Sequence, residues 1–367
     1  MSTPSPLTIL RVFLKLGATS FGGPIAHLAL MDQELVQKRA WLSRHDFLEL
    51  HAITQLIPGP NSTELAMAIG HQLAGRAGLL AAGVGFIVPA FLSSGVLAIL
   101  YLQAGRLPIG QEILYTIRPL ILVIILRALY AFARQLPRQP LLWIGGSALA
   151  AHLLGVHELL ILLLGGLSLI FRNRTTRMKA PAFLAMLTPK SMDIGTLPEI
   201  FQIFFKIGAV LFGSGYTLLL YLREDLVDRL GWLTESQLLD AITVGQITPG
   251  PLFSTATFIG FLLQGWPGAG LATLGIFGPA FLMIAFGAYL LPRLRRHPEV
   301  PRFLQGVNSA SMGLMLYVSF SMIRVSLIDT LSIGLAVGAF FLLEKARMDA
   351  GLLIFLGVVM GCLKYFL

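Results

Sequence analysis

Charged residues are scarce in this chain of 367 residues. Only 12% of its residues are Asp, Glu, Lys or Arg, whereas a typical soluble protein carries about 25%. Hydrophobic residues make up 56% of the chain, and the mean hydropathy is +0.79. A water-soluble protein could not bury so much apolar surface, so the sequence predicts an all-α polytopic membrane protein.

The chain has a single cysteine and no nucleotide-binding motif. The single cysteine, Cys362, excludes an internal disulfide framework and a cysteine-ligated metal site. The sequence contains no Gly-Lys pair and therefore no P-loop, so we do not expect ATP-driven pumping. Residues 1–8 lack the basic and apolar regions of a cleaved signal peptide.

Metal-ligand patterns are also absent. His27, His51 and His71 stand in no such pattern, and we interpret them as packing residues. The net charge of +9 has a simpler cause than nucleic-acid binding, because Lys and Arg collect in the cytoplasmic loops of membrane proteins. We expect no metal, no cofactor and no nucleic-acid partner.

The sequence contains a duplication. A segment that begins at Phe13 returns from Phe204 in the same order and register. The matched segments are 13–18 with 204–209, 21–22 with 212–213, 41–43 with 232–234, 55 with 246, 58–60 with 249–251 and, after the loss of one residue, 89–92 with 279–282. Chance does not keep register over such a distance. We predict homologous halves at 1–171 and 198–367, joined by a basic cytoplasmic linker at 172–197.

Loop charges indicate how the two halves lie in the membrane. The basic connections are 38–44, 134–138, 172–190, 293–302 and 345–347. All five lie in the cytoplasm if each half has about five crossings plus a re-entrant hairpin broken at Pro-Gly-Pro, and if the second half starts on the opposite side. This layout is an inverted repeat, the design of many secondary transporters. A parallel repeat in which every segment crosses is the competing layout.

The expected crossings follow from the apolar segments. They are 9–30, 77–102, 113–133, 140–154 and 158–171 in the first half, and 199–220, 268–291, 303–323, 328–343 and 351–366 in the second. Several are shorter than the roughly 20 residues that a span needs. Tilted pairs or partial spans therefore remain open for these segments.

Two Pro-Gly-Pro motifs interrupt apolar segments and are the first candidate site. A proline disfavours helix at the residue before it, and it suits the first position of a new helix. Open amides at such a helix start, together with the helix dipole, form an anion site. The candidate substrate-binding residues are Gly59, Pro60, Asn61, Ser62 and Thr63 after the first break, and Gly250, Pro251 and Ser254 after the second. Because more polar residues follow the first break, we place the primary anion contact there; a plain proline kink is the alternative.

Further candidates occur at equivalent places in both halves. Lys15 and Lys206 lie in the opening helix of each half and could supply positive charge to an anion, or could reach the membrane interface. The glycine-rich turns contribute Gly22, Gly23, Gly213 and Ser214, which would allow close approach of a ligand or tight helix packing. Gln55 and Gln246 precede the two breaks and could donate to an oxyanion or cap the broken helix.

Four further charged residues are considered individually. Arg118 precedes Pro119 in an apolar run, and we take it as a substrate-binding candidate. Glu64 is the one acid close behind a Pro-Gly-Pro, and we take it as the proton-coupling candidate. Arg127 is a weaker candidate, and Arg324 at a predicted helix end is interpreted as an interface anchor.

The order of these motifs resembles the chromate ion transporter (CHR) family in its long, two-domain form. The resemblance lies in Phe-Gly-Gly-Pro at 21–24, Phe-Gly-Ser-Gly at 212–215, and the two Pro-Gly-Pro motifs, each preceded by a glutamine. It covers nearly the whole chain. It implies a bacterial inner-membrane protein that exports chromate, confers chromate resistance and is driven by the proton motive force, with halves of opposite orientation.

Substrate and mechanism stay partly open at this point. Sulfate has nearly the shape and charge of chromate, and a pocket of amides and cations discriminates such isosteres poorly. The favoured mechanism is alternating access around a midplane anion site, in which chromate exchanges for protons. A sulfate transporter, an anion channel and a membrane chromate reductase are the alternatives, and a homodimer is left open. The reductase lacks support because no flavin or metal motif occurs.

Overall fold

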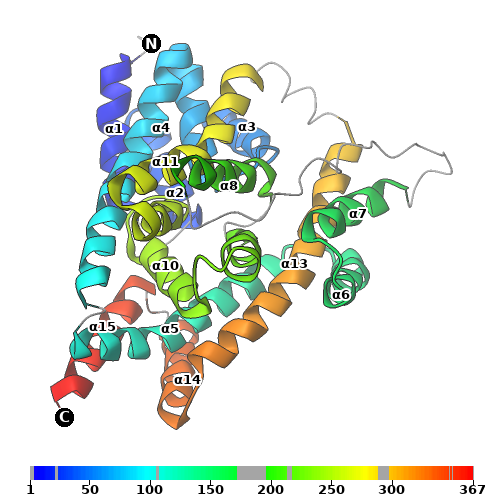
Figure 1. Cartoon of the computed structure of the whole chain (residues 1–367). Coiled ribbons are helices and arrows are strands. Elements are labelled where there is room, and N and C mark those ends of the chain that lie inside the picture. Colours follow the sequence, from blue (N-terminus) through cyan, green and yellow to red (C-terminus); the bar gives the residue numbers. More distant parts are fainter. Residues whose placement is uncertain are drawn as a thin grey trace.

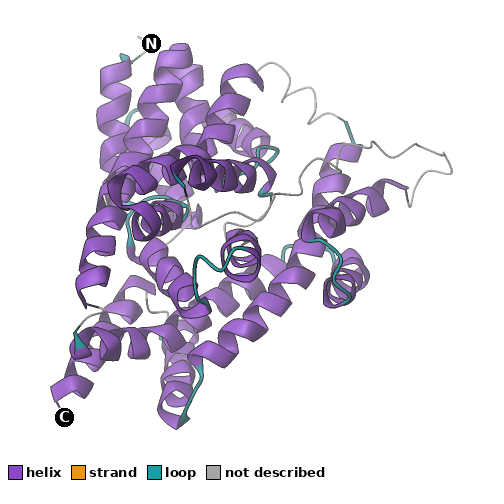
Figure 2. Cartoon of the chain, viewed as in Figure 1, coloured by secondary structure: helices purple, strands orange, loops and turns teal. Residues whose placement is uncertain are grey.

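The computed structural model describes residues 4–20, 24–104, 107–171, 196–212, 217–287, 297–346, 348 and 350–366. Within these ranges the chain forms helices and connecting loops without a β-strand (Figure 2). Four of the helices, α4, α5, α11 and α13, are long and apolar enough to cross a membrane. The prediction of an all-α polytopic membrane protein is confirmed.

The same order of helices occurs twice along the chain (Figure 1). The first half contains α1 (Pro6–Thr19), α2 (Pro24–Met31), the π-helix η1 (Asp32–Lys38), α3 (Arg44–Thr54), α4 (Ser62–Ala104), α5 (Pro108–Ala133), α6 (Arg138–Leu153) and α7 (Glu158–Phe171). The second half contains α8 (Leu197–Val210), α9 (Leu218–Leu222), the π-helix η4 (Arg223–Arg229), α10 (Glu235–Ile247), α11 (Ser254–Gly287), α13 (Glu299–Ser326), α14 (Thr330–Glu344) and α15 (Ala350–Phe366). The two halves are therefore homologous in structure as well as in sequence.

Both Pro-Gly-Pro motifs break a helix, as predicted. α3 ends at Thr54 and α4 begins at Ser62, and α10 and α11 are separated in the same way. α4 then turns back sharply at Ala74 and Gly75, where φ and ψ leave the helical region, and α11 does so at 264–265. Each thus has a short arm (62–73 and 254–263) and a long arm (76–104 and 266–287). The broken helix and the short arm form the predicted re-entrant hairpin.

The two arms of α4 pack closely because glycines face each other. A Cβ atom on Gly78 would overlap the carbonyl oxygen of Gly70, and a Cβ atom on Gly70 would overlap Gly78. We expect Gly78→Ala to lower the free energy of unfolding by about 1–3 kcal/mol through overpacking, as measured by thermal unfolding in detergent. Gly146→Ala is the matched control because a Cβ atom there meets open space. Equal stability of the two variants would contradict this packing.

The first predicted crossing of each half is wrong as a continuous span. The segment expected at 9–30 is divided between α1 and α2, and the one at 199–220 is divided between α8 and α9. α1 ends at Thr19 and Pro24 begins α2, a position that suits proline. From the sequence we considered a bend at the glycine-rich turns but kept each segment as one crossing.

The long arms of α4 and α11 show that the halves are inverted. Gly83 of α4 packs against Phe281 of α11, and Gly95 packs against Trp266, so the two arms run antiparallel. A twofold axis that relates two antiparallel helices is perpendicular to the helix axes. Because these helices are the ones that can cross the membrane, the axis lies in the membrane plane and the repeat is inverted.

The halves also interlock. α5 of the first half packs on α14 and α15 of the second, and α13 packs in the equivalent way on α6 and α7. On the outer surface, one face of the long arm of α4 carries large apolar side chains that are 44–56% exposed, namely Leu80, Val84, Leu92, Val96 and Leu100. Their helical spacing forms an apolar stripe that suits contact with lipid.

Candidate functional site

The chain breaks of the two halves meet in the interior. The N–H of Gly59, in the first Pro-Gly-Pro, donates to the carbonyl oxygen of Leu211 at 2.9 Å, where α8 ends. The N–H of Gly250, in the second, donates to the carbonyl oxygen of Ser20 at 2.8 Å, where α1 ends. Each Pro-Gly-Pro thus contacts the break of the opposite half, and the two contacts obey the repeat symmetry. Irregular backbone is tolerated at membrane depth when it is buried in protein in this way.

Local residue types explain the shape of the first break. Gly59 has a φ of +139° and Asn61 a φ of +55°, both in the left-handed region. Glycine adopts that region freely, and asparagine adopts it more readily than other residues. The counterpart of Asn61 is Leu252, which is not left-handed. Asn61, one of the polar residues after the first break, is therefore explained by the backbone conformation at its position.

Glu64 lies against the first break. Its side chain is fully buried, and a Cβ atom on Gly59 would overlap its carboxyl oxygen. The backbone N–H groups of Asn61 and Glu64 face the carboxyl group, yet neither carboxyl oxygen has a hydrogen bond of normal geometry within the described ranges. The carboxyl group therefore occupies the place at the start of α4 where the sequence predicted a bound anion.

Other buried polar groups surround this carboxyl group. His27, on α2, is 1% exposed, packs edge-on against Phe86 and places Nδ1 3.1 Å from the hydroxyl of Ser62. His27 Nε2, the hydroxyl of Ser20 and the hydroxyl of Thr63 have no hydrogen-bond partner among the residues that the structure describes. Buried polar groups are nearly always paired, so such a cluster requires an explanation.

Among the residues that the structure describes, the second break has no equivalent cluster. The hydroxyls of Thr248 and Ser254 pair with each other at 3.0 Å, and Thr255 donates to the carbonyl oxygen of Leu252 at 2.8 Å. The counterparts of Ser62 and Glu64 are Phe253 and Thr255. The polar groups of the second break are thus largely satisfied locally, and the buried carboxyl group belongs to the first break alone.

A pocket of about 460 Å³ leads to the first break from one side. It lies between α3, the end of α5 and the start of α13, so that residues of both halves form its walls. Its polar lining consists of Gln55, Asn61, Gln135, Gln305 and Asn308, and no acidic residue of the described part of the chain lines it. Arg134, Arg138 and Arg302 adjoin lining residues in the chain and are exposed. The pocket is referred to below as the amide pocket.

At the symmetry-related position on the other side, side chains of the two halves are tied together. Arg118, the counterpart of Asn308, donates two hydrogen bonds of 2.9 Å to Asp240 on α10, and Tyr101 donates a third at 2.9 Å. Tyr115, the counterpart of Gln305, donates to Asp329 at 2.7 Å. Arg118 is therefore paired with a carboxylate that is 1% exposed.

The two duplicated glutamines reflect this difference. Gln55 is exposed and lines the amide pocket, and its Nε2 lies 3.3 Å from Nε2 of His51. Gln246, its counterpart, is only partly exposed, and its Nε2 is buried without a hydrogen-bond partner among the residues described. The glutamine before the first break is therefore more accessible to solvent than the one before the second.

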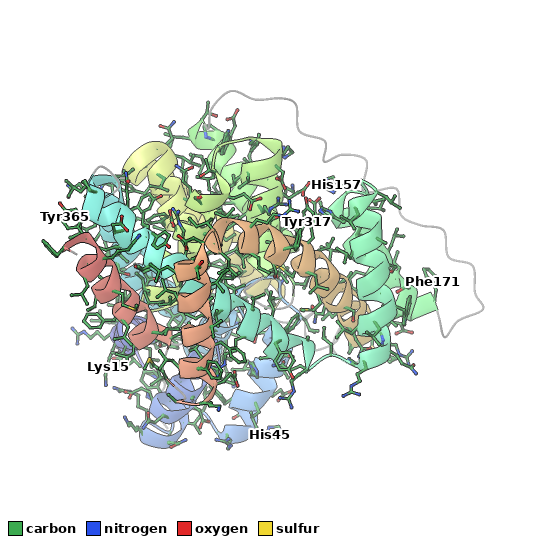
Figure 3. All side chains as sticks on the ribbon, turned by 90° about the horizontal axis from the view of Figure 1, so that it is seen from below. Lys15, His45, His157, Phe171, Tyr317 and Tyr365 are labelled. Atoms are coloured by element: carbon green, nitrogen blue, oxygen red, sulfur yellow. The ribbon has the colours of Figure 1, made fainter. Side chains whose placement is uncertain are left out.

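The paired lysines contact acids of their own half. Lys15 is 64% exposed and lies 3.8 Å from Glu34, at the periphery of the N-terminal helices (Figure 3). Lys206 is 17% exposed and lies 2.9 Å from Asp225. Glu34 and Asp225 occupy equivalent positions in the two π-helices. Neither lysine belongs to the buried cluster at the first break, so their role in anion binding stays a prediction.

Four candidates lie outside the described residues, namely Gly22, Gly23, Gly213 and Ser214. Of the remaining arginines, Arg127 pairs with Glu344 at 2.9 Å with both side chains about half exposed. Arg324 lies over the ring of Phe320 near the end of α13. Gly59, Pro60, Asn61, Ser62 and Thr63 lie together at the first break, and Gly250, Pro251 and Ser254 lie at the second.

Several residues of the site were missed by reasoning from the sequence. Gln135, Gln305 and Asn308 carry no local signal, because a lone amide in an apolar helix is usually a packing or surface residue. His27 packs as expected but also contacts Ser62. Asp240 could have been suspected as the acid that Arg118 requires inside the membrane.

Comparisons with known proteins agree with the duplicated organisation. The chain matches the family model described as chromate transporter twice, at residues 7–170 and 198–362. A probable chromate transport protein of Synechococcus elongatus is 32% identical over 89% of this chain and 87% of its own length. Chromate transport proteins of Cupriavidus metallidurans and Pseudomonas aeruginosa are each 30% identical over 92% of this chain and 88% and 87% of their own lengths. No solved structure matches the chain significantly.

Proposed function

Because the chain belongs to the chromate transporter family, we propose that it is a secondary active transporter that exports chromate across the bacterial inner membrane. Export of this oxyanion would confer chromate resistance. The observation that carries the proposal is the buried cluster at the first break, where Glu64, His27 and Thr63 hold polar atoms without partners among the described residues. The solvent-accessible amide pocket reaches the first break at Asn61, three residues before Glu64 in the chain.

Glu64 is proposed to couple transport to protons. A buried carboxyl group without a paired cation is costly when ionised, and in this position it also faces the route of a dianion. At an effective dielectric constant of about 20 and a separation of about 8 Å, an ionised carboxylate opposes a dianion by about 4 kcal/mol. Binding of a proton and binding of the dianion are thereby linked. Because each makes binding of the other more favourable, this linkage favours movement of the proton and the dianion in the same direction. The sequence instead led us to expect exchange of chromate for protons. The sign of the imposed proton gradient that drives chromate uptake distinguishes the two.

Alternating access is supported by the asymmetry between the two sides. The amide pocket is open, whereas at the symmetry-related position the Arg118–Asp240 and Tyr115–Asp329 contacts tie the two halves together. The open side adjoins Arg134, Arg138 and Arg302, whose loops we predict to be cytoplasmic. We therefore take this conformation as the inward-open one, in which the cytoplasmic substrate enters. A channel would need an open path on both sides.

The test is transport by the purified chain in proteoliposomes. We expect saturable flux of chromate that sulfate competes for and that falls at least tenfold when a protonophore collapses an imposed proton gradient. Liposomes without protein provide the control. Absence of both chromate and sulfate flux would reject oxyanion transport, whereas saturable flux that is indifferent to the gradient would reject only the proton coupling.

A further inference from the structure

The walls of the amide pocket have an unusual composition for a cavity in an apolar protein. Primary amides contribute five of the side chains that line it, from α3, the first break, the end of α5 and α13, and no carboxylate is among them. Each Asn or Gln amide offers two N–H donors that can be turned toward an acceptor. A cavity of about 460 Å³ holds a small tetrahedral anion with part of its hydration shell.

We propose that the amide pocket is a binding site for a tetrahedral oxyanion dianion, and that Gln135, Gln305 and Asn308 help to form it. This proposal rests on the proposed function, since the dianion would be the transported substrate. Asn308 carries the argument furthest, because its Oδ1 is buried without a hydrogen-bond partner within the described ranges. Oδ1 only accepts hydrogen bonds, so the amide pairs with an oxyanion after a half-turn about χ2 that presents Nδ2–H, and this turn breaks no Oδ1 hydrogen bond.

Charge supports the same assignment. Arg134, Arg138 and Arg302 stand next to lining residues in the chain and are exposed, so they raise the local concentration of anions at the entrance. The pocket itself holds neutral donors rather than paired arginines. Neutral donors bind an anion less tightly than a buried cation would, which suits a site that has to release its ligand within each transport cycle.

The repeat symmetry explains why the site occurs on one side only. Asn308 and Gln305 correspond to Arg118 and Tyr115, which are held by Asp240 and Asp329. Gln135 corresponds to Val325, and Asn61 to Leu252. The amides of the pocket are thus replaced on the other side either by side chains that hydrogen-bond to carboxylates of the protein or by apolar side chains.

The test adds a negative charge to the pocket without changing its shape. We expect Asn308→Asp and Gln305→Glu each to weaken sulfate and chromate binding to the purified full-length chain at least tenfold in calorimetric titration. Gln111→Glu is the matched control, since Gln111 is exposed at the opposite end of α5 from Gln135. Melting temperatures of the variants verify folding, and Asn308→Leu, which adds no charge, should weaken binding in the same direction.

The outcomes separate this proposal from the proposed function. Wild-type flux of chromate in proteoliposomes together with unchanged anion affinity in Asn308→Asp and Gln305→Glu would overturn the pocket and leave the transport function intact. Absence of oxyanion flux and of oxyanion binding in the wild-type chain would overturn both. Protection of a cysteine placed at position 305 from a thiol reagent by sulfate, in a Cys362→Ser background, would support the pocket independently of affinity.

Discussion

Glu64→Gln is expected to abolish the dependence of chromate transport on the proton gradient. Gradient-driven accumulation in proteoliposomes should fall at least tenfold, while exchange of labelled chromate across the membrane should persist. The reason is that the glutamine keeps the shape of the buried side chain but cannot bind or release a proton. Expression and melting temperature should remain close to those of the wild-type chain, because the carboxyl oxygens make no hydrogen bond among the described residues that the substitution would remove.

The same substitution predicts a change in the pH dependence of anion binding. In the wild-type chain, sulfate affinity should fall as the pH rises. An ionised Glu64 makes the binding free energy of the dianion less favourable by about 4 kcal/mol at a separation of about 8 Å. In Glu64→Gln, affinity should be high and nearly independent of pH. Sulfate is the suitable probe, since it remains a dianion throughout the range, whereas chromate takes up a proton near neutrality.

Glu49→Gln is the matched control for this experiment. Glu49 lies on α3, one element before the break, and its side chain is exposed to solvent, so its substitution should leave both the coupling and the pH dependence unchanged. Retention of full gradient dependence in Glu64→Gln would show that the proton is carried elsewhere. His27, which faces Ser62 in the same cluster, would then be the next group to test.

The parts of this architecture that could be predicted from the sequence are those set by local chemistry or by repetition. Proline removes a backbone donor and constrains its neighbour, so the motifs predict that the preceding helices stop by Ile57 and Thr248, and α3 and α10 end at Thr54 and Ile247. The inversion follows from the positions of Lys and Arg in loops. The difference between the two breaks follows from comparing their residues, since Ser62 and Glu64 of the first correspond to Phe253 and Thr255 of the second.

The remaining features depend on contacts that are distant in sequence. The partner of Lys206 is Asp225 of a π-helix, and no local pattern marks that π-helix. The contact between Gly59 and Leu211 requires that the halves face each other across their breaks. Asn308 becomes part of a pocket only when α13 lies opposite α3. Such residues are identified by assembly of the halves rather than by periodicity or motif.

Arg118→Gln is expected to shift the protein out of the conformation described here. In this conformation Arg118 joins α5 of the first half to α10 of the second through Asp240, whose side chain is 1% exposed. Removing one partner of a buried ion pair costs about 3–5 kcal/mol, and the lower value applies because Arg118 is 25% exposed. A loss of about 3 kcal/mol from one of two states changes their ratio about a hundredfold.

The reactivity of cysteines placed at the two duplicated glutamine positions, 55 and 246, shows which conformation is populated. In a Cys362→Ser background, we expect a cysteine at position 55 to react with a membrane-impermeant thiol reagent and a cysteine at position 246 to be protected, since Gln55 is exposed and Nε2 of Gln246 is buried. Arg118→Gln should reverse this pattern, so that position 246 reacts faster and position 55 more slowly. Reaction at 246 without protection at 55 would instead indicate local unfolding of the closed side.

A charge exchange distinguishes the ion pair from a requirement for arginine as a substrate ligand. If Arg118 acts through Asp240, the double variant Arg118→Asp with Asp240→Arg should restore part of the original reactivity pattern and of chromate flux, although each single variant loses at least tenfold. If Arg118 binds the oxyanion directly, the double variant should stay inactive, because a carboxylate would then stand where the anion requires a cation. The repeat makes the first outcome the expected one. In the opposite half, Asn308 occupies the position of Arg118 and lines the amide pocket. An arginine is thus found where an ion pair joins the two halves, and an amide where the pocket lies between them.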